Sequence, residues 1–154
     1  MNAEHGREWV LVTESSLEPA ALTAWVTRPD CGAVVTFCGT ARNSSGVGHV
    51  IESLEYETSV DLAQDRIARV IARARSRWPD LGAVAIHHRV GVVRLEEPAV
   101  VIAVASPHRG TAYDASRFCI DAVKSCVPMW KRETWAGGSA WSEEAQDLLD
   151  VSEL

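Results

Sequence analysis

Two lysines are the residues of this chain best suited to chemistry near neutral pH. The sequence has 154 residues with 15 lysines and arginines, and only Lys124 and Lys131 among them are lysines. A GC-rich genome explains the scarcity of lysine without a functional cause. An arginine stays charged at any useful pH, however, whereas a lysine amine loses its proton readily when it is buried or lies near other cations. We therefore take these two amines as candidate proton donors or nucleophiles.

The two lysines lie on either side of a predicted helix end. Lys124 falls in the last turn of a helix predicted over 111–127, where the helix dipole alone favours a cation. The segment 129–135 follows a proline and is predicted to be a short strand, whose alternation puts Lys131 and Arg132 on opposite sides. If Lys131 points toward Lys124, two neighbouring ammonium groups favour the loss of one proton, which gives an acid or nucleophile usable near pH 7.

A glycine-rich loop follows the predicted buried strand at 31–38. It begins with Gly39, Thr40, Ala41 and Arg42. Backbone N–H groups in such a loop can approach an anion, and the guanidinium group of Arg42 can bind a phosphate or carboxylate. A solvent-exposed hairpin tip is the alternative interpretation.

A second candidate anion site joins the predicted strand 99–106 to the helix after it. His108 and Arg109 lie in this connection, and Thr111 with Asp114 three residues later is typical of a helix N-terminus. Free N–H groups at that end favour a phosphate, with Arg109 supplying charge and His108 a titratable group. The alternative is a polar connection in which His108 only bonds nearby backbone.

Two other clusters are expected to be structural. His87 and His88 are adjacent on a predicted strand, so their side chains point to opposite faces and cannot easily bind one metal ion. The second cluster is a row of arginines on the predicted helix 60–77, expected to face solvent with Asp61 and Asp65 as partners. These arginines are Arg66, Arg69, Arg73, Arg75 and Arg77.

Hydrophobic patterns predict the elements that position these residues. Strands are predicted at 8–13, 31–38, 50–58, 83–89, 99–106 and 129–135, and helices at 16–28, 60–77, 111–127 and 142–151. Residues 91–98 are expected to be a connection and Gly137-Gly138 a turn. The strand 99–106 is apolar on both faces and therefore central. The order predicts one α+β domain over 1–154, with two long helices on a mixed, mainly antiparallel sheet and an acidic C-terminal helix from about residue 142.

Composition and charge narrow the classes of function. The chain is 47% hydrophobic with a net charge of -6, which is typical of a globular protein and unfavourable for nucleic-acid binding. We expect no membrane contact, because no segment approaches the roughly 20 apolar residues of a membrane helix and the N-terminus lacks a secretory signal. Four cysteines without a CxxC pair indicate reduced thiols in a cytoplasmic protein. No metal site or cofactor is expected.

Six short motifs follow one another along residues 31–141. They are Phe37-x-Gly39-x-x-Arg42, Leu54-x-Tyr56-Glu57, His88-Arg89-x-Gly91, Ser106-x-His108-Arg109, Asp121-x-x-Lys124 and Pro128-x-Trp130-Lys131-Arg132-Glu133. As a set they resemble the large, catalytic subunit of molybdopterin synthase. The resemblance implies an α/β hammerhead-type fold and a homodimer of large subunits, with a small ubiquitin-like sulfur-carrier subunit at each end of this heterotetramer.

The resemblance also implies a sulfurtransferase reaction of molybdenum cofactor biosynthesis. Cyclic pyranopterin monophosphate receives two sulfurs from the thiocarboxylated C-terminus of the small subunit, which forms the dithiolene of molybdopterin. A non-enzymatic module that binds an extended peptide tail is the alternative, and a nucleic-acid-binding protein ranks third.

The same resemblance assigns roles to individual residues. Lys124 and Lys131 match the two catalytic lysines, His108 and Arg109 an anion-binding pair, Thr40, Ala41 and Arg42 the first loop, and Arg132 and Glu133 further substrate contacts. The resulting hypothesis places the cyclic phosphate on Arg109, the helix N-terminus and Arg42. Lys124 then lies nearest the sulfur-transfer centre, and Lys131 orients the substrate.

Overall fold

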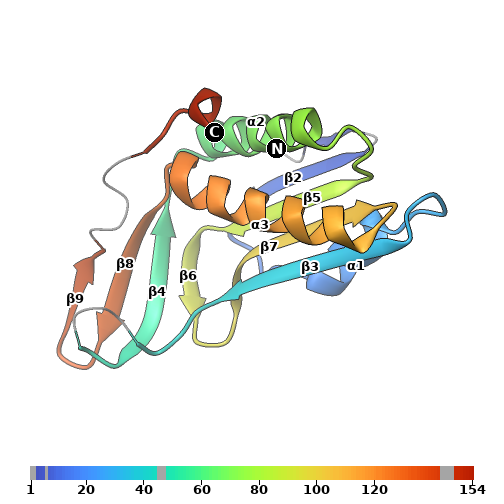
Figure 1. The fold of residues 1–154 in the computed structure, drawn as a ribbon. Coiled ribbons are helices and arrows are strands. Elements are labelled where there is room, and N and C mark those ends of the chain that lie inside the picture. The colour runs from blue at the N-terminus through green and yellow to red at the C-terminus, as the bar shows by residue number, and fades with distance from the viewer. Residues whose placement is uncertain (1–2, 6, 45–47, 143–147) are drawn as a thin grey trace.

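Two β-sheets lie next to each other, and helices cover both faces of the larger one (Figure 1). The computed structural model describes residues 3–5, 7–44, 48–142 and 148–154. The larger sheet has the strand order β1-β2-β5-β7-β3 and the smaller one β6-β4-β8-β9. Among these strands β2 and β5 pair in parallel, and the other neighbours pair antiparallel. The α+β class and the mixed, mainly antiparallel sheet are therefore confirmed.

The helices and strands are bounded as follows. The larger sheet contains β1 (Ala3–His5), β2 (Glu8–Thr13), β3 (Ala33–Thr40), β5 (Val84–Arg89) and β7 (Pro98–Ser106). The smaller sheet contains β4 (Ile51–Glu57), β6 (Gly91–Arg94), β8 (Trp130–Trp135) and β9 (Gly138–Trp141). The helices are α1 (Pro19–Val26), α2 (Val60–Arg77), α3 (Arg109–Cys126) and the short 3-10 helix η2 (Val151–Glu153).

Side chains of different size cover the two faces of the larger sheet. On the central strand β7, Ile102 and Val104 face the layer formed by α2 and α3, where the main hydrophobic core lies. Ala103 and Ala105 face the opposite side and pack against Leu22 of α1. Because β7 is covered on both faces, its side chains are apolar at successive positions, as the sequence predicted.

Two strands of the smaller sheet were expected to be loop. β6 and β9 are four residues each and pair with β4 and β8, respectively. Gly91 and Gly137 have φ values of 79° and 98°, a left-handed conformation that glycine adopts without strain and that redirects the chain beside each strand. Segments this short carry too little alternation to be distinguished from turns in the sequence.

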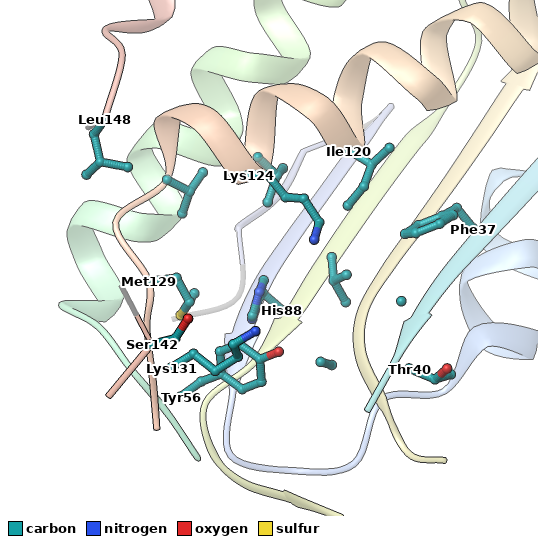
Figure 2. Close-up of a pocket in the computed structure, with 15 residues that line it drawn as sticks. Phe37, Thr40, Tyr56, His88, Ile120, Lys124, Met129, Lys131, Ser142 and Leu148 are labelled. Atoms are coloured by element: carbon teal, nitrogen blue, oxygen red, sulfur yellow. The ribbon is translucent and has the colours of Figure 1, made fainter. Parts of the chain in front are cut away.

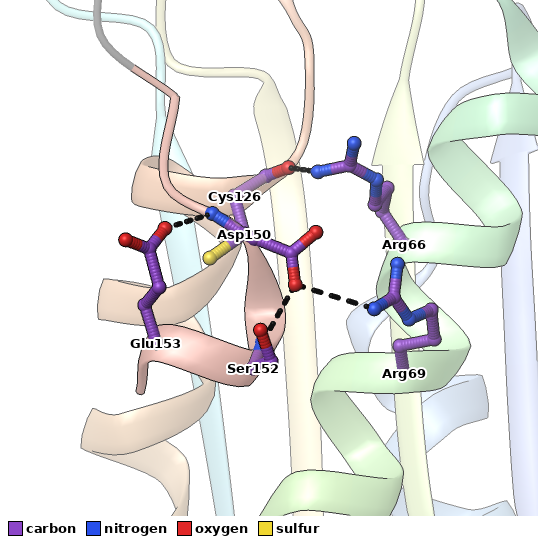
Figure 3. A network of polar contacts seen from close by, with 6 residues as sticks. All are labelled: Arg66, Arg69, Cys126, Asp150, Ser152 and Glu153. Atoms are coloured by element: carbon purple, nitrogen blue, oxygen red, sulfur yellow. Dashed lines mark hydrogen bonds and ion pairs between the residues drawn. The ribbon is translucent and has the colours of Figure 1, made fainter.

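The arginines of α2 keep partial or full exposure, but the partners that they contact are not the expected Asp61 and Asp65. Figure 3 shows Arg69 bound to the carboxylate of Asp150 at 3.4 Å. Arg73 donates to the backbone oxygen of Leu154. The other three also contact the protein: Arg66 the Cys126 backbone oxygen, Arg75 the Glu8 carboxylate, and Arg77 the ring of Phe118. The C-terminal segment therefore contacts the polar stripe of α2 through Arg69 and Arg73, while Arg69 and Arg77 stay exposed.

The acidic segment 142–151 differs from the predicted helix. Residue 142 and residues 148–150 are not helical, and residues 143–147 lie outside the described part of the chain. η2 begins after Asp150, whose carboxylate accepts from the N–H of Ser152 at 2.9 Å, while Glu153 accepts from the N–H of Asp150 at 2.7 Å. Val151 is buried beside α2 and anchors this segment.

The helix α3 begins earlier than the sequence suggested. Arg109 is its first residue and His108 its N-cap, so Thr111 and Asp114 lie inside the helix and do not cap it. Its last turn contains Lys124, and Pro128 follows its end, as expected. None of the described helices combines the length and hydropathy needed to span a membrane.

Candidate active site

A cavity of about 360 Å³ opens between the C-terminal half of α3, the smaller sheet and one end of β3 and β7 (Figure 2). This volume lies at the lower end of the range typical of small-molecule sites. Its lining residues are Phe37, Gly39, Thr40, Tyr56, His88, Ala99, Val100, Ile120, Val123, Lys124, Val127, Met129, Lys131, Ser142 and Leu148. The cavity therefore has a mixed lining of apolar side chains and polar groups, among them two amines and an imidazole.

The helix α3 brings Lys124 to the cavity. Ile120 and Val127 are four residues before and three residues after Lys124, so all three lie on one side of the helix and line the cavity. The adjacent stripe of α3, which includes Cys119 and Ala122, is buried against the sheet and fixes the rotation of the helix. Lys124 is itself exposed, so its amine meets both the cavity and solvent.

The strand β8 brings Lys131 to the same cavity from the opposite side. Lys131 is paired in register with Tyr56 of β4, and its amine lies 3.7 Å from the carboxylate of Glu133. The side chains of Lys131 and Glu133 are 25% and 14% exposed, so solvent screens this ion pair less than a surface pair. Arg132 faces away from the cavity and binds Glu55, as strand alternation predicted.

His88 is a cavity residue that the sequence reasoning treated as structural. It lies on β5 on the same face as Ile86, toward α3, and is 6% exposed. Its ring packs edge-on against Tyr56, with 5.3 Å between ring centroids. Burial lowers the pKa of His88 to about 4, and the nearby Lys124 charge acts in the same direction. The imidazole is therefore neutral at pH 7.

The neighbouring His87 has the structural position that was expected. Its ring packs edge-on against Trp9 with 4.4 Å between ring centroids, on the face of β5 that carries α1. Burial lowers its pKa to about 4 as well. The sequence contained a signal for this difference. Side chains two residues apart on a strand share a face, so His88 lies on the face of Ile86 and His87 lies on the opposite face.

The first-loop residues lie at different distances from the cavity. Thr40 lines it, and Ala41 is buried in the core of the smaller sheet with Ile51 and Leu54. Arg42 is exposed and is not among the lining residues. Only the first of these three predicted substrate contacts therefore borders the space between the lysines.

The predicted anion-binding pair lies at the far end of α3. His108 and Arg109 are exposed at the N-terminus of this helix. Fifteen residues separate Arg109 from Lys124, and at 1.5 Å per residue they are about 22 Å apart along the helix. Within one chain, the structure thus brings Lys124 and Lys131 together and separates them from His108 and Arg109.

Among the described residues, the groups that could do chemistry in the cavity do not include a cluster of metal ligands or a reactive thiol. Within the described residues, no group of three or more His, Cys, Asp or Glu side chains has the geometry of a metal site. Cys119 is buried in the main core, and burial raises its pKa to about 12. The polar chemistry available in the cavity is therefore that of amines, an imidazole, hydroxyl groups and the carboxylate of Glu133 beside Lys131.

The chain is similar to known proteins over most of its length. The family described as MoaE protein matches residues 12–126. The molybdopterin synthase catalytic subunit of Thermoplasma volcanium is 43% identical over 131 residues, which cover 85% of this chain and 94% of that protein.

Solved structures support the same relationship. The crystal structure of molybdopterin synthase from Staphylococcus aureus matches with a TM-score of 0.81 and 34% identity, covering 85% of this chain and 94% of that one. A complex of subunits 1 and 2 of the molybdopterin-converting factor from Helicobacter pylori matches with a TM-score of 0.73, covering 90% of this chain and 92% of that one. Its sequence identity is 15%, so this match shows a likeness of fold alone. The chain belongs to the MoaE family, the catalytic subunits of molybdopterin synthase, which act in molybdenum cofactor biosynthesis.

Proposed function

We propose that this chain transfers sulfur from the thiocarboxylated C-terminus of a small ubiquitin-like subunit to cyclic pyranopterin monophosphate, in the cavity between Lys124 and Lys131. The observation that carries the proposal is that the chain's two lysines, on separate elements, line one cavity. Thirteen other cationic positions are arginine. A cavity that holds two ammonium groups beside apolar side chains suits a reaction in which charge moves between sulfur and oxygen.

Lys124 acts closest to the sulfur-transfer centre in this proposal. Sulfur transfer forms a carbon–sulfur bond on the pterin side chain with loss of an oxygen from that carbon, and water then cleaves the acyl–sulfur bond, so that the small subunit leaves as a carboxylate. The ammonium group of Lys124 polarises the thiocarboxylate or protonates the oxygen that leaves the pterin carbon. Apolar side chains of Ile120 and Val123 line the cavity beside it, and a peptide tail bound there displaces water from the exposed amine, which strengthens the interaction between the ammonium group and the thiocarboxylate. Lys131 is held by Glu133 and orients the pterin substrate.

Substitution of Lys124 tests this assignment. We expect Lys124→Ala to abolish product formation with thiocarboxylated small subunit and cyclic pyranopterin monophosphate, while circular dichroism and the thermal midpoint stay those of the wild type. Arg117→Ala, on the exposed surface of the same helix, is the matched control and should keep full activity. Near wild-type turnover by Lys124→Ala would show that the assignment is wrong.

The second part of the proposal is a homodimer in which one copy completes the site of the other. The separation of about 22 Å between Arg109 and Lys124 exceeds what one small substrate can bridge. β3 is the last strand of the larger sheet, so its outer edge offers backbone groups to a second chain. A partner copy that supplies His108 and Arg109 would return the predicted anion pair to the lysines.

Mixed dimers test the shared site. Lys124→Ala and Arg109→Ala are each expected to be inactive as pure proteins. A dimer of one copy of each has one site with both defects and one intact site, so a statistical mixture should recover about a quarter of wild-type activity. If both residues serve the same site within one copy, mixing restores nothing, and the shared-site proposal fails while the role of Lys124 stands.

We place this reaction in the cytoplasm. The four cysteines are free thiols, as expected for a reducing compartment. Because the family is enzymatic, a module that only binds a peptide tail is no longer needed as an alternative. Capture of an extended tail is instead the first step of the proposed reaction.

A further inference from the structure

The buried histidine in the cavity has no role in the mechanism described above. His88 stands out because His87, next to it in sequence and equally buried, has no contact with the cavity. The two residues are 6% and 3% exposed, respectively, and burial lowers both of their pKa values to about 4. What distinguishes them is the chemistry of their surroundings: His87 packs against Trp9, whereas His88 packs against Tyr56 and lines the same cavity as the two lysines.

The hydrogen bonding of His88 determines its tautomer. Its Nδ1 lies 2.8 Å from the backbone oxygen of Arg89. A carbonyl oxygen only accepts hydrogen bonds, so in the neutral ring Nδ1 carries the proton and donates it. Nε2 is then an acceptor with a free lone pair. Nε2 is also the ring nitrogen farther from the backbone, so it is the one that reaches toward the cavity.

The two amines approach this ring from different sides. In Figure 2, Lys124 points down from α3 toward His88, and Lys131 approaches from β8 on the other side of the ring. The charge of Lys124 is close enough to disfavour protonation of His88. An ammonium group has three N–H donors and no acceptor, so its natural partner is an acceptor such as Nε2.

We propose that His88 is a positioning residue for sulfur transfer: when substrate occupies the cavity, its Nε2 accepts a hydrogen bond from the ammonium group of Lys124 and directs that group toward the reacting atoms. The inference rests on the proposed role of Lys124. Lys124 has a long, exposed side chain with considerable rotational freedom, so a fixed partner reduces the number of orientations in which its amine is unproductive. The bond from Nδ1 to Arg89 keeps the ring itself in place.

Two substitutions separate hydrogen bonding from packing. His88→Phe keeps a ring against Tyr56 but removes the acceptor, whereas His88→Gln supplies an amide oxygen near the position of Nε2. We expect His88→Phe to lower the single-turnover rate about 10- to 150-fold, the effect of losing one hydrogen bond to a charged group. KM for the small subunit and for the pterin should change less than about twofold, because the lost contact orients a group and does not bind substrate. His88→Gln should recover most of the rate.

His87→Phe and His87→Gln are matched controls, since they change an equally buried histidine on the same strand. Both should turn over at the wild-type rate if they fold. Equal losses of rate for His88→Phe and His88→Gln, or a loss of the same size for His87→Phe, would overturn the inference.

Nuclear magnetic resonance tests the inference without any change at His88. We expect the imidazole to be protonated at Nδ1 and not at Nε2 at pH 7, and the Nε2 resonance of substrate-bound protein to shift when Lys124 is replaced by Ala. A proton on Nε2 would refute the proposed acceptor. The outcomes are separable: an active Lys124→Ala variant contradicts the role of Lys124, whereas an inactive Lys124→Ala with a fully active His88→Phe contradicts only the role of His88.

Discussion

Mild acid should destabilise this protein, because two buried histidines remain neutral in the fold. Burial lowers the pKa of both His87 and His88 to about 4, against about 6.5 in an unfolded chain. Between these values the unfolded chain binds more protons than the native protein, so stability is full above pH 6.5 and decreases as the pH falls toward 4. From pH 7 to pH 5 each histidine accounts for a loss of roughly 2 kcal/mol, about 4 kcal/mol together.

A loss of this size is easily measured, since a domain is stable by only about 5–15 kcal/mol. Urea unfolding at pH 7, 6 and 5 should show the midpoint falling by about 2 M in total, for a slope near 2 kcal/mol per molar urea. His87→Phe keeps an aromatic ring against Trp9 and removes one titrating group, so it should halve the pH dependence. The reasoning is refuted if the wild type loses less than about 1 kcal/mol, or if His87→Phe retains the full slope.

Three further predictions concern other parts of the molecule. Gly82→Ala should cost about 1–3 kcal/mol in urea unfolding, because the new Cβ would lie 2.5 Å from the sulfur of Cys31 and 2.8 Å from a backbone oxygen; an unchanged midpoint would contradict this. With a thiol reagent, exposed Cys38 should react in the native protein and buried Cys119 only after unfolding, as counted by mass spectrometry. Lys124→Arg should keep KM within a few-fold and lower kcat at least about tenfold, since a guanidinium group keeps the charge but is too weak an acid to give up a proton near neutral pH; equal kcat values would rule out proton transfer there.

Long elements were predictable because their signals are local. The apolar stripe of α2 repeats through five turns, and its bounds at 60–77 agree with the prediction. The continuous apolar run of β7 correctly indicated a central strand. By contrast, β6 and β9 are held by pairing with β4 and β8, whose positions are not encoded within those four-residue segments. Their formation depends on tertiary contacts that hydrophobic periodicity does not contain.

The arginines of α2 show a second limit of sequence patterns. The polar stripe correctly identified the side of the helix turned away from the main core. It did not identify the partners that the arginines on that side bind. Arg69 and Arg73 contact Asp150 and Leu154, which follow them by about eighty residues. Periodicity separates apolar from polar faces, but it cannot distinguish solvent from a distant segment of the same chain that binds charged groups.

In the candidate site, too, the local features were predictable from the sequence and the tertiary contacts were not. Alternation on β8 correctly put Lys131 and Arg132 on opposite faces, because side-chain direction along a strand is local. Lys131 and Lys124 line the same cavity because β8 pairs with β4 and α3 packs beside them. These contacts are tertiary, so the sequence could not predict whether Lys131 points toward Lys124. His88 was assessed only as a metal ligand beside His87, although the same alternation places it on the face that carries α3.

The separation of the lysines from the predicted anion pair was already contained in the sequence. A single helix connects Arg109 with Lys124, and a helix is a rigid spacer of 1.5 Å per residue. No packing of that helix can bring its two ends into one cavity, whatever the surrounding fold. A substrate phosphate bound by His108 and Arg109 must therefore react with lysines of another copy, or these two residues serve no substrate at the Lys124 cavity. The Arg109→Ala variant decides between these alternatives. If the two ends of α3 from different copies share a site, it is inactive alone and recovers activity in mixed dimers with Lys124→Ala; if His108 and Arg109 serve no substrate there, it is active alone.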